Sequence, residues 1–183
     1  SNYKRIYVST HYLHEKISKF LDNRKSKAEI AIIHEKKPLG TAGSISSIKS
    51  SNFDTLTVLN GDVLTEVDLN ALNQFHKDKK LDLTITVAQY SFKVPFGVVS
   101  LDKKFTFKSL SEKPIQKHFV LSGIYCLSRR ARAIVKKSYL DMPDLINYAK
   151  ALDYKIGVFP IYEYWNDVGT YESLHFEKSR RIN

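Results

Sequence analysis

Two aspartates lie where a carboxylate could hold a metal ion beside a phosphate group. Asp62 closes a short polar turn after an apolar run at residues 56–59, and Asp167 lies between Trp165 and a glycine turn at Gly169. A carboxylate at the carboxyl end of a parallel strand points into the crevice where α/β proteins bind ligands. Magnesium bound to phosphates takes one or two such carboxylates and leaves its other positions to water and phosphate. Asp62 and Asp167 are therefore candidate ligands of Mg²⁺.

Each aspartate also has a purely structural interpretation. Asp62 fits an Asn-Gly turn with a helix-capping acid, and Asp167 fits a cap of the last helix. No other type of metal site competes, since the close histidine pair, His11 and His14, lacks the HExxH spacing of zinc proteases. Cys126 lies among apolar residues, a position typical of an inert core thiol.

A loop of small residues and a charged pair are the remaining candidates. Residues 38–44, Pro-Leu-Gly-Thr-Ala-Gly-Ser, enter a helix, where glycines let a ligand approach the backbone and unpaired N–H groups favour an anion or the polar edge of a base. Glu112 and Lys113 precede a rigid proline and could hold a sugar hydroxyl and a phosphate respectively. A plain tight turn and an exposed ion pair are the structural alternatives.

The elements that must position these residues alternate along the first half of the chain. Asp68 is expected to cap one of the helices. The alternation predicts an α/β layered fold with a largely parallel sheet, in which residues 30–33 and 56–59 are buried strands. The expected strands are 6–8, 30–33, 56–59 and 83–88, and the expected amphipathic helices are 13–21 and 69–75.

The second half predicts an antiparallel lobe inserted into the same domain. Residues 96–101 and 105–110 flank a polar turn and predict a hairpin. No linker, repeat or low-complexity stretch divides the chain, so residues 1–183 are interpreted as one domain. Further strands are expected at 120–127 and 156–159, and helices at 130–137, 142–152 and 170–178, with Pro143 in a first turn opened by Asp141.

Composition narrows the function classes. No apolar run approaches the roughly 20 residues of a membrane helix, and one cysteine weakly favours a reducing cytoplasm. The net charge of +10 comes mostly from scattered lysines, with dense basic runs only at residues 129–132 and 180–181 and no interleaved aromatics. A solvated basic surface is therefore preferred over a nucleic-acid or membrane interface, and a cytoplasmic location is expected.

Taken in order, these segments resemble the sugar-1-phosphate nucleotidyltransferase family, the nucleotide-sugar pyrophosphorylases. Each segment is weak alone, but together they follow the family's order and spacing across essentially the whole chain. The matching segments are Pro38-Leu39-Gly40-Thr41-Ala42-Gly43, Asn60-Gly61-Asp62, Pro95-Phe96-Gly97-Val98-Val99, Glu112-Lys113-Pro114, Ser122-Gly123-Ile124-Tyr125, Asp141-Met142-Pro143-Asp144-Leu145 and Trp165-Asn166-Asp167-Val168-Gly169-Thr170.

The resemblance implies a fold and a reaction. The fold is the Rossmann-like three-layer nucleotide-diphospho-sugar transferase fold, α/β, with a mostly parallel mixed sheet and an inserted antiparallel lobe. The reaction is attack by a sugar 1-phosphate oxygen on the α-phosphorus of an NTP, which expels pyrophosphate and depends on Mg²⁺. Such chemistry needs alignment and charge neutralisation more than proton transfer, so carboxylate-bound metal and lysine suit it.

The resemblance also implies residue roles. The catalytic residues would be Asp62 and Asp167, which would hold Mg²⁺, and Lys113, which would bind the sugar phosphate. The substrate-binding residues would be Gly40, Thr41 and Ala42 for the base and ribose, Gly61, Glu112 for the sugar hydroxyls, and Gly123 in the sugar pocket. The substrates would be an NTP and a hexose or amino-sugar 1-phosphate.

One departure from the family is large. Its members open with a strand and a glycine-rich loop that grips the triphosphate, and nothing in this chain matches that loop. The chain is therefore expected to be an N-terminally truncated domain that releases no pyrophosphate alone, while a version extended upstream would.

Residues 156–168 most resemble bacterial members that often act as guanylyltransferases on amino sugars and carry a regulatory domain upstream. GTP is thus a candidate nucleotide, while the choice of base and homo-oligomerisation stay open. A non-catalytic nucleotidyltransferase-like module serving regulation or assembly is the alternative function.

Overall fold

The computed structural model describes residues 3–180 and divides the chain into two compact units. Each unit is assembled from segments that are separated in the sequence. The first unit comprises residues 1–61, 68–85 and 123–159, and the second comprises residues 62–67, 86–122 and 160–183. The interpretation of the chain as one domain stays a prediction.

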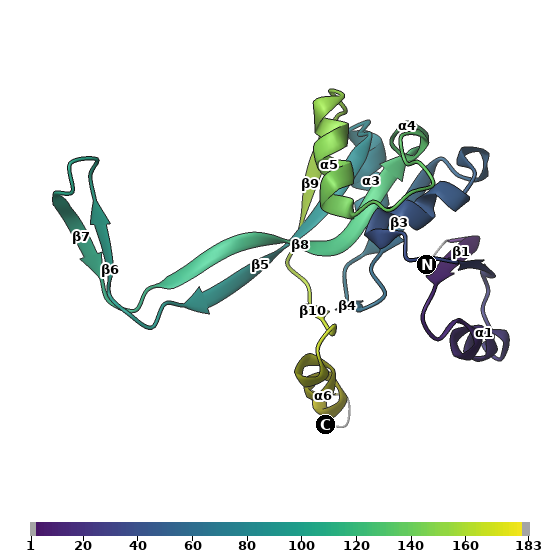
Figure 1. Ribbon diagram of the computed structural model, residues 1–183, viewed down its shortest axis with the longest axis horizontal. Coiled ribbons are helices and arrows are strands. Elements are labelled where there is room, and N and C mark those ends of the chain that lie inside the picture. Colours follow the sequence, from purple (N-terminus) through teal and green to yellow (C-terminus); the bar gives the residue numbers. More distant parts are fainter. Residues whose placement is uncertain (1–2, 181–183) are drawn as a thin grey trace. The chain divides into compact units, whose positions relative to one another are not determined.

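The order of the elements follows the alternation expected from the sequence (Figure 1). They are β1 (Arg5–Thr10), α1 (His14–Asp22), β2 (Glu29–His34), α2 (Gly40–Gly43), η1 (Ser44–Ser47), η2 (Ser50–Asn52), β3 (Thr55–Leu59), β4 (Val63–Thr65), α3 (Leu69–Asp78), β5 (Leu83–Lys93), β6 (Val98–Leu101), β7 (Phe107–Ser111), β8 (Ile115–Ser128), α4 (Arg129–Ala133), α5 (Met142–Ala151), β9 (Ile156–Ile161), β10 (Trp165–Asp167) and α6 (Tyr171–Arg180).

Strands β1 and β2 form a parallel two-stranded sheet in the first unit. The register runs from Arg5 opposite Glu29 to Thr10 opposite His34. The prediction that residues 30–33 form a buried strand is wrong in its burial, because these residues are only half-buried. Helix α1 contacts β2, but none of the residues of α1 is buried, so this helix covers the strand only in part.

A four-stranded sheet with the order β3-β8-β5-β9 provides the framework of the larger core. Strand β3 lies at its edge and runs antiparallel to β8, with Thr55 opposite Ser128 and Leu59 opposite Ile124. The prediction of a buried strand at 56–59 is therefore corrected. Leu56 and Val58 pack on the core, whereas Leu59 is 43% exposed, since an edge strand is covered on one side only.

The mixed α/β class is confirmed, with parallel and antiparallel pairs both present. Antiparallel pairing is more prominent than the alternation of strands and helices predicted, because β8 returns beside β3 in the opposite direction. The argument that placed Asp62 at the end of a parallel strand changes as a result. Asp62 does follow β3, but the neighbour of β3 in its sheet is antiparallel.

The core of the first unit lies between this sheet and α5 (Figure 1). Met142, Leu145 and Ala149 are at most 1% exposed, and their spacing of three and four residues puts them on one face of α5. They pack with Leu83 of β5 and Leu127 of β8. Helix α5 begins after Asp141 with a proline in its first turn, as the sequence predicted.

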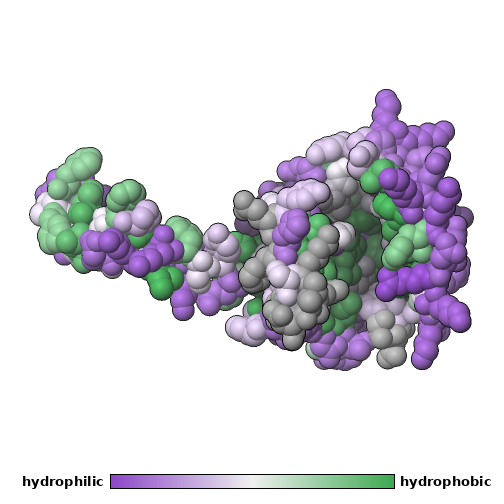
Figure 2. All heavy atoms as spheres, turned by 90° about the horizontal axis from the view of Figure 1, so that it is seen from below, coloured by the Kyte–Doolittle hydropathy of each residue, from purple (hydrophilic) through white to green (hydrophobic). Residues whose placement is uncertain are grey.

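The hairpin predicted in the second half is confirmed as β6 and β7. Val98 lies opposite Ser111 in an antiparallel pair, and the turn is closed by Asp102 Oδ1, which accepts hydrogen bonds from the amides of Lys104 and Thr106 at 2.8 and 2.9 Å. Figure 2 shows apolar residues on the surface of this hairpin among hydrophilic ones, and Phe105 is 86% exposed.

Among the described residues, no helix has the length and apolar character that crossing a membrane requires.

Candidate functional site

A short antiparallel pair in the second unit brings the two predicted metal ligands together. Asp167, at the end of β10, lies opposite Val63 of β4, and the amide of Val168 donates to the carbonyl oxygen of Asp62 at 2.8 Å. A Cβ placed on Gly169 would lie 2.9 Å from Asp167 Oδ1 and 3.2 Å from Asp62 Oδ2. Both carboxylates therefore approach one point beside the backbone of Gly169.

Neither aspartate has the helix-capping role that the sequence left open. Helix α3 is capped by Asp68, whose side chain accepts from the amide of Asn70 at 2.8 Å, as predicted. Thr170 takes the position before α6, and its Oγ1 accepts from the amide of Ser173 at 3.2 Å. Asp62 and Asp167 thus serve no helix terminus in this fold.

The carboxylates of Asp62 and Asp167, here called the acid pair, accept few hydrogen bonds from the described residues. Both side chains belong to exposed residues. Within residues 3–180, Asp167 accepts one side-chain hydrogen bond, from the amide of Gly169 at 2.8 Å, and the carboxylate of Asp62 accepts none. No ion pair of the described residues includes either acid. Two carboxylates held close without a cation repel each other, so the arrangement is suited to a bound cation.

The donor set suits magnesium better than a structural metal. No group of three or more His, Cys, Asp or Glu residues that could hold a metal occurs in the described part of the chain. Zinc in a structural site takes four protein ligands, whereas Mg²⁺ keeps several waters and is bound through one or two carboxylates plus phosphate oxygens. Asp62 and Asp167 fit the second description.

Neither of the two strands that create this pair is predicted by the sequence. Strands β4 and β10 are three residues long, which is too short for an alternating pattern to be recognised. Trp165 gives a signal in retrospect, since its indole Nε1 donates to the carbonyl of Ser122 at 2.7 Å and anchors β10. The sequence places Trp165 two residues before Asp167, but it does not reveal that Ser122 is the partner of the indole.

The loop at 38–43 has a different character from the one expected. Gly40 has φ of 74°, and a Cβ there would lie 2.6 Å from the carbonyl oxygen of Leu140. The amides of Ala42 and Gly43 donate to that same oxygen at 2.9 and 3.2 Å, and the amide of Thr41 donates to Asp141. The expectation of unpaired N–H groups is therefore wrong for these three residues, because residues 140–141 occupy them.

Gly123 lies within β8, next to Ile124, which pairs with Leu59 at the end of β3. Its φ is 77°, a conformation that favours glycine, and its carbonyl accepts from the amide of Asn60 at 2.9 Å. At Gly61, which follows Asn60, the described residues other than its chain neighbours place no atom within 4 Å of where a Cβ would be. The polar turn that leads to Asp62 is thus tied to Gly123 and open at Gly61.

Glu112 and Lys113 follow β7. A Cβ on Gly97 would lie 2.9 Å from Glu112 Oε2, so the carboxylate lies against that glycine. Lys113 has φ of 46°, in the left-handed region. Across the described residues the two side chains form no ion pair, which removes the structural alternative, and no hydrogen bond or ion pair joins either to Asp62 or Asp167.

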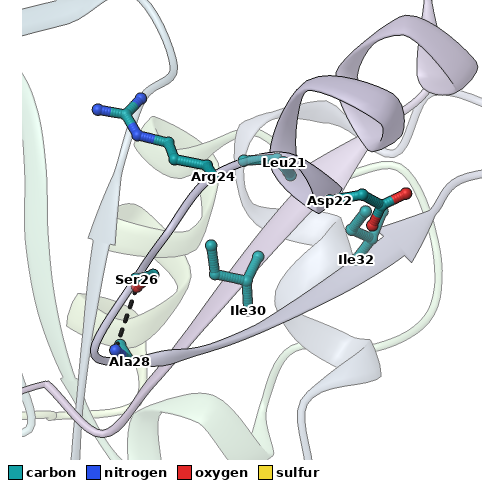
Figure 3. Close-up of a pocket in the computed structure, with 7 residues that line it drawn as sticks. All are labelled: Leu21, Asp22, Arg24, Ser26, Ala28, Ile30 and Ile32. Atoms are coloured by element: carbon teal, nitrogen blue, oxygen red, sulfur yellow. Dashed lines mark hydrogen bonds between the residues drawn. The ribbon is translucent and has the colours of Figure 1, made fainter.

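A pocket in the first unit is lined by none of the predicted site residues. It has a volume of about 190 Å³ and lies between the end of α1, the following turn and β2 (Figure 3). Ligand pockets are commonly of roughly 300–1,000 Å³. Its lining mixes apolar and polar side chains with no cluster of catalytic groups, and consists of Leu21, Asp22, Arg24, Ser26, Ala28, Ile30 and Ile32.

The dense basic run at 129–132 has internal partners. Arg129 pairs with Asp54 at 2.6 Å, Arg130 pairs with Asp82 at 3.1 Å, and Arg132 donates to the carbonyls of Ser46 and Ile48. These contacts support the expectation that this run is not a nucleic-acid surface.

Cys126 is fully buried, which confirms its placement in the core, and burial raises the pKa of its thiol to about 11. It is therefore unsuited to nucleophilic work.

Two relatives of known name are similar to most of this chain. The mannose-1-phosphate guanylyltransferase of Mycobacterium tuberculosis is 28% identical over 175 residues, covering 86% of this chain and 45% of that protein. The catalytic subunit beta of the Drosophila pseudoobscura enzyme of the same name is 26% identical over 173 residues, covering 91% of this chain and 47% of its own length. The chain thus spans about half the length of these relatives.

A solved structure shares the fold. HddC from Yersinia pseudotuberculosis, complexed with GMP-PN, superposes with a TM-score of 0.72 at 21% identity, covering 98% of this chain and 79% of that one. Finally, the sequence profile described as nucleotidyl transferase matches residues 1–181. The coverage is nearly complete, and the chain belongs to the nucleotidyl transferase family.

Proposed function

We propose that this chain is the catalytic part of a Mg²⁺-dependent sugar-1-phosphate nucleotidyltransferase, which joins an NTP to a sugar 1-phosphate with release of pyrophosphate. One observation carries the proposal: Asp62 and Asp167 converge on the point beside Gly169 without a counter-charge among the described residues. In a member of the nucleotidyl transferase family, a pair of carboxylates with no structural task fits a role in holding a metal on phosphates.

The proposed roles follow from what each group offers. Asp62 and Asp167 hold Mg²⁺, which would neutralise charge on the phosphates of the nucleotide. Lys113 binds the sugar phosphate, Glu112 accepts from the sugar hydroxyls, and Gly123 lines the sugar pocket. Gly40, Thr41 and Ala42 form the nucleotide loop. This chemistry consists of alignment and charge stabilisation, so no general base is required of the chain.

Gly61 has a role that the geometry supports separately. Apart from its chain neighbours, none of residues 3–180 lies within 4 Å of a Cβ placed there, and its backbone does not need positive φ. The chain itself therefore does not require glycine at this position. A close approach of substrate to the backbone would require it.

The nucleotide is proposed to be GTP and the sugar a hexose 1-phosphate. Relatives named mannose-1-phosphate guanylyltransferase and a neighbour solved with GMP-PN support a guanine base. Mannose 1-phosphate is the first sugar to test, with amino-sugar 1-phosphates as the second group. Because the reaction would use cytoplasmic nucleotides, we also propose the cytoplasm as its compartment. Homo-oligomerisation and an upstream regulatory domain stay predictions.

Calorimetric titration tests the proposal. GTP, ATP, UTP, CTP and dTTP are titrated into the chain with and without Mg²⁺, followed by each sugar 1-phosphate. We expect Mg²⁺-dependent binding of one nucleotide, lost in the Asp62→Asn variant while the thermal unfolding midpoint is kept. Absence of binding by all five nucleotides would overturn the proposal.

Pyrophosphate release separates catalysis from the alternative. It is measured with GTP and mannose 1-phosphate on the 183-residue chain and on the natural full-length protein side by side. Release that depends on Asp167 supports an enzyme. Binding of both substrates without release by either protein would favour the non-catalytic regulatory or assembly module.

A further inference from the structure

Two helix starts in the first unit are capped by each other's side chains. Asp141 Oδ1 accepts a hydrogen bond from the amide of Thr41, in the first turn of α2, at 3.0 Å. In return, Thr41 Oγ1 accepts from the amide of Met142, the first residue of α5, at 2.8 Å. The partners are about one hundred positions apart in the sequence. Each helix start thus has one of its unpaired amides satisfied from outside.

Neither helix is capped in the ordinary way. Leu39, before α2, has no side-chain hydrogen bond to its helix, and Asp141, before α5, makes none to its own helix. An Asp at this position usually accepts from the second or third amide of the helix that it precedes. Here Asp141 Oδ1 accepts from Thr41 in the loop at 38–43 instead, and Asp141 Oδ2 accepts from the Tyr139 hydroxyl at 2.8 Å.

Backbone hydrogen bonds also join the loop at 38–43 to Leu140. The amide of Leu140 donates to the carbonyl of Leu39 at 2.9 Å, and the carbonyl of Leu140 accepts from Ala42 and Gly43. Gly40 admits this approach, because a Cβ there would lie within 2.7 Å of Asp141 Oδ1. The loop and residues 139–142 therefore form one hydrogen-bonded arrangement, in which both parts must be present for either to be satisfied.

We propose that this reciprocal cap holds the loop at 38–43 in its nucleotide-binding shape, so that Asp141 is a positioning residue for the nucleotide. The inference rests on the proposed function for the loop itself. Thr41 then acts through its hydroxyl on α5, rather than by donating that hydroxyl to a ligand. A loop that is already ordered loses little conformational freedom when a ligand binds, which favours affinity.

Three variants isolate the two halves of the cap. Thr41→Val removes the acceptor for Met142 with little change in volume, Thr41→Ser restores it, and Asp141→Ala removes the acceptor for Thr41. Ser47→Ala is the matched control, since Ser47 is an exposed hydroxyl of the neighbouring η1 turn for which the described residues provide no hydrogen bond. The readouts are nucleotide affinity with Mg²⁺, Mg²⁺ affinity without nucleotide, and amide hydrogen exchange.

We expect about tenfold weaker nucleotide binding in Thr41→Val and Asp141→Ala, and a value close to wild type in Thr41→Ser and Ser47→Ala. Exchange should accelerate at the Met142 amide in the first variant and at the Thr41 amide in the second. Mg²⁺ affinity should stay unchanged in all four, because Asp62 and Asp167 belong to the other unit.

Three results would overturn the inference, and each has a different consequence for the proposed function. If wild type binds a nucleotide and both cap variants bind it equally well despite faster exchange, the positioning role is wrong and the proposed function stands. If wild type binds no nucleotide, the proposed function fails and the positioning role falls with it. A parallel loss of Mg²⁺ and nucleotide affinity would indicate general destabilisation and would also contradict the positioning role.

Discussion

The loop at 38–43 in the first unit and the acid pair, Asp62 and Asp167, in the second differ in how many of their polar groups are hydrogen-bonded within the described chain. In the loop, the amides of Thr41, Ala42 and Gly43 and the carboxylate of Asp141 all find partners within the chain. In the acid pair, the described residues provide one backbone amide for two carboxylates. The difference teaches that internal hydrogen bonds define the shape of a site, while unsatisfied charges define the chemistry that it can perform.

The sharpest test of this comparison removes one charge from the acid pair. In a version of the chain extended upstream, we expect Asp62→Asn and Asp167→Asn each to lower pyrophosphate release by on the order of 10²-fold or more, since a charge that stabilises the phosphates is lost. The thermal unfolding midpoint should stay level or rise slightly, because two like charges no longer face each other. Full activity in both variants would remove the metal assignment, and a fall in the midpoint would show that the acids serve the fold.

A second test acts on the space between the acids without touching them. Gly169→Ala should weaken Mg²⁺ binding about tenfold, as a Cβ there would meet both carboxylates at 2.9 and 3.2 Å and push them apart. Gly61→Ala is the matched control for Mg²⁺, since the chain leaves that position open. Equal Mg²⁺ affinity in the two variants, measured by calorimetry, would contradict the convergence of Asp62 and Asp167.

A third test concerns the backbone conformation at Gly123 and changes no charged group. Gly123→Ala should lower the free energy of unfolding by about 1–2 kcal/mol, because alanine at φ of 77° is strained. Urea unfolding followed by circular dichroism measures the change. Gly61→Ala, whose φ is not positive, should change it by less than about 0.5 kcal/mol. Comparable losses in both would show that the backbone at Gly123 does not need glycine.

The smallest expected effect is a pH dependence of the loop. The amide of Thr41 and, next, the hydroxyl of Tyr139 hold the pKa of Asp141 below its usual value. A carboxyl whose pKa is lowered on folding contributes stability that is present above its unfolded value of 3.8 and is lost as the pH falls through the lower folded value. Exchange at the Thr41 amide should therefore stay protected at pH 5 and lose protection only below about pH 3.8. An NMR titration showing Asp141 with a raised pKa would contradict the hydrogen bond.

Much of the fold and of the residue list could be predicted from local pattern. The order of strands and helices, the cap of α3, the start of α5 after Asp141, the hairpin of β6 and β7 and the core position of Cys126 follow from periodicity, from turn residues and from apolar neighbours. These features depend on residues close in the chain. The family was recognisable for a related reason, since its short segments keep their order and spacing.

Burial and pairing could not be predicted in the same way. The partial exposure of β2 and β3 depends on which elements cover them, and the antiparallel return of β8 depends on a chain reversal between β5 and β8. The expected unpaired amides of the loop were wrong because their partners lie about one hundred residues away. Distance along the chain says nothing about such contacts.

By itself, the sequence determined which residues could hold a metal, a phosphate or a sugar, because those properties belong to the side chains. Only the tertiary structure decided which of these residues have a partner already. It brought Asp62 and Asp167 together through two strands of three residues each and left their charges uncompensated within the described chain. It also paired Thr41 with Asp141, because a helix start that lacks its own cap takes the nearest acceptor in space, whatever its position in the sequence.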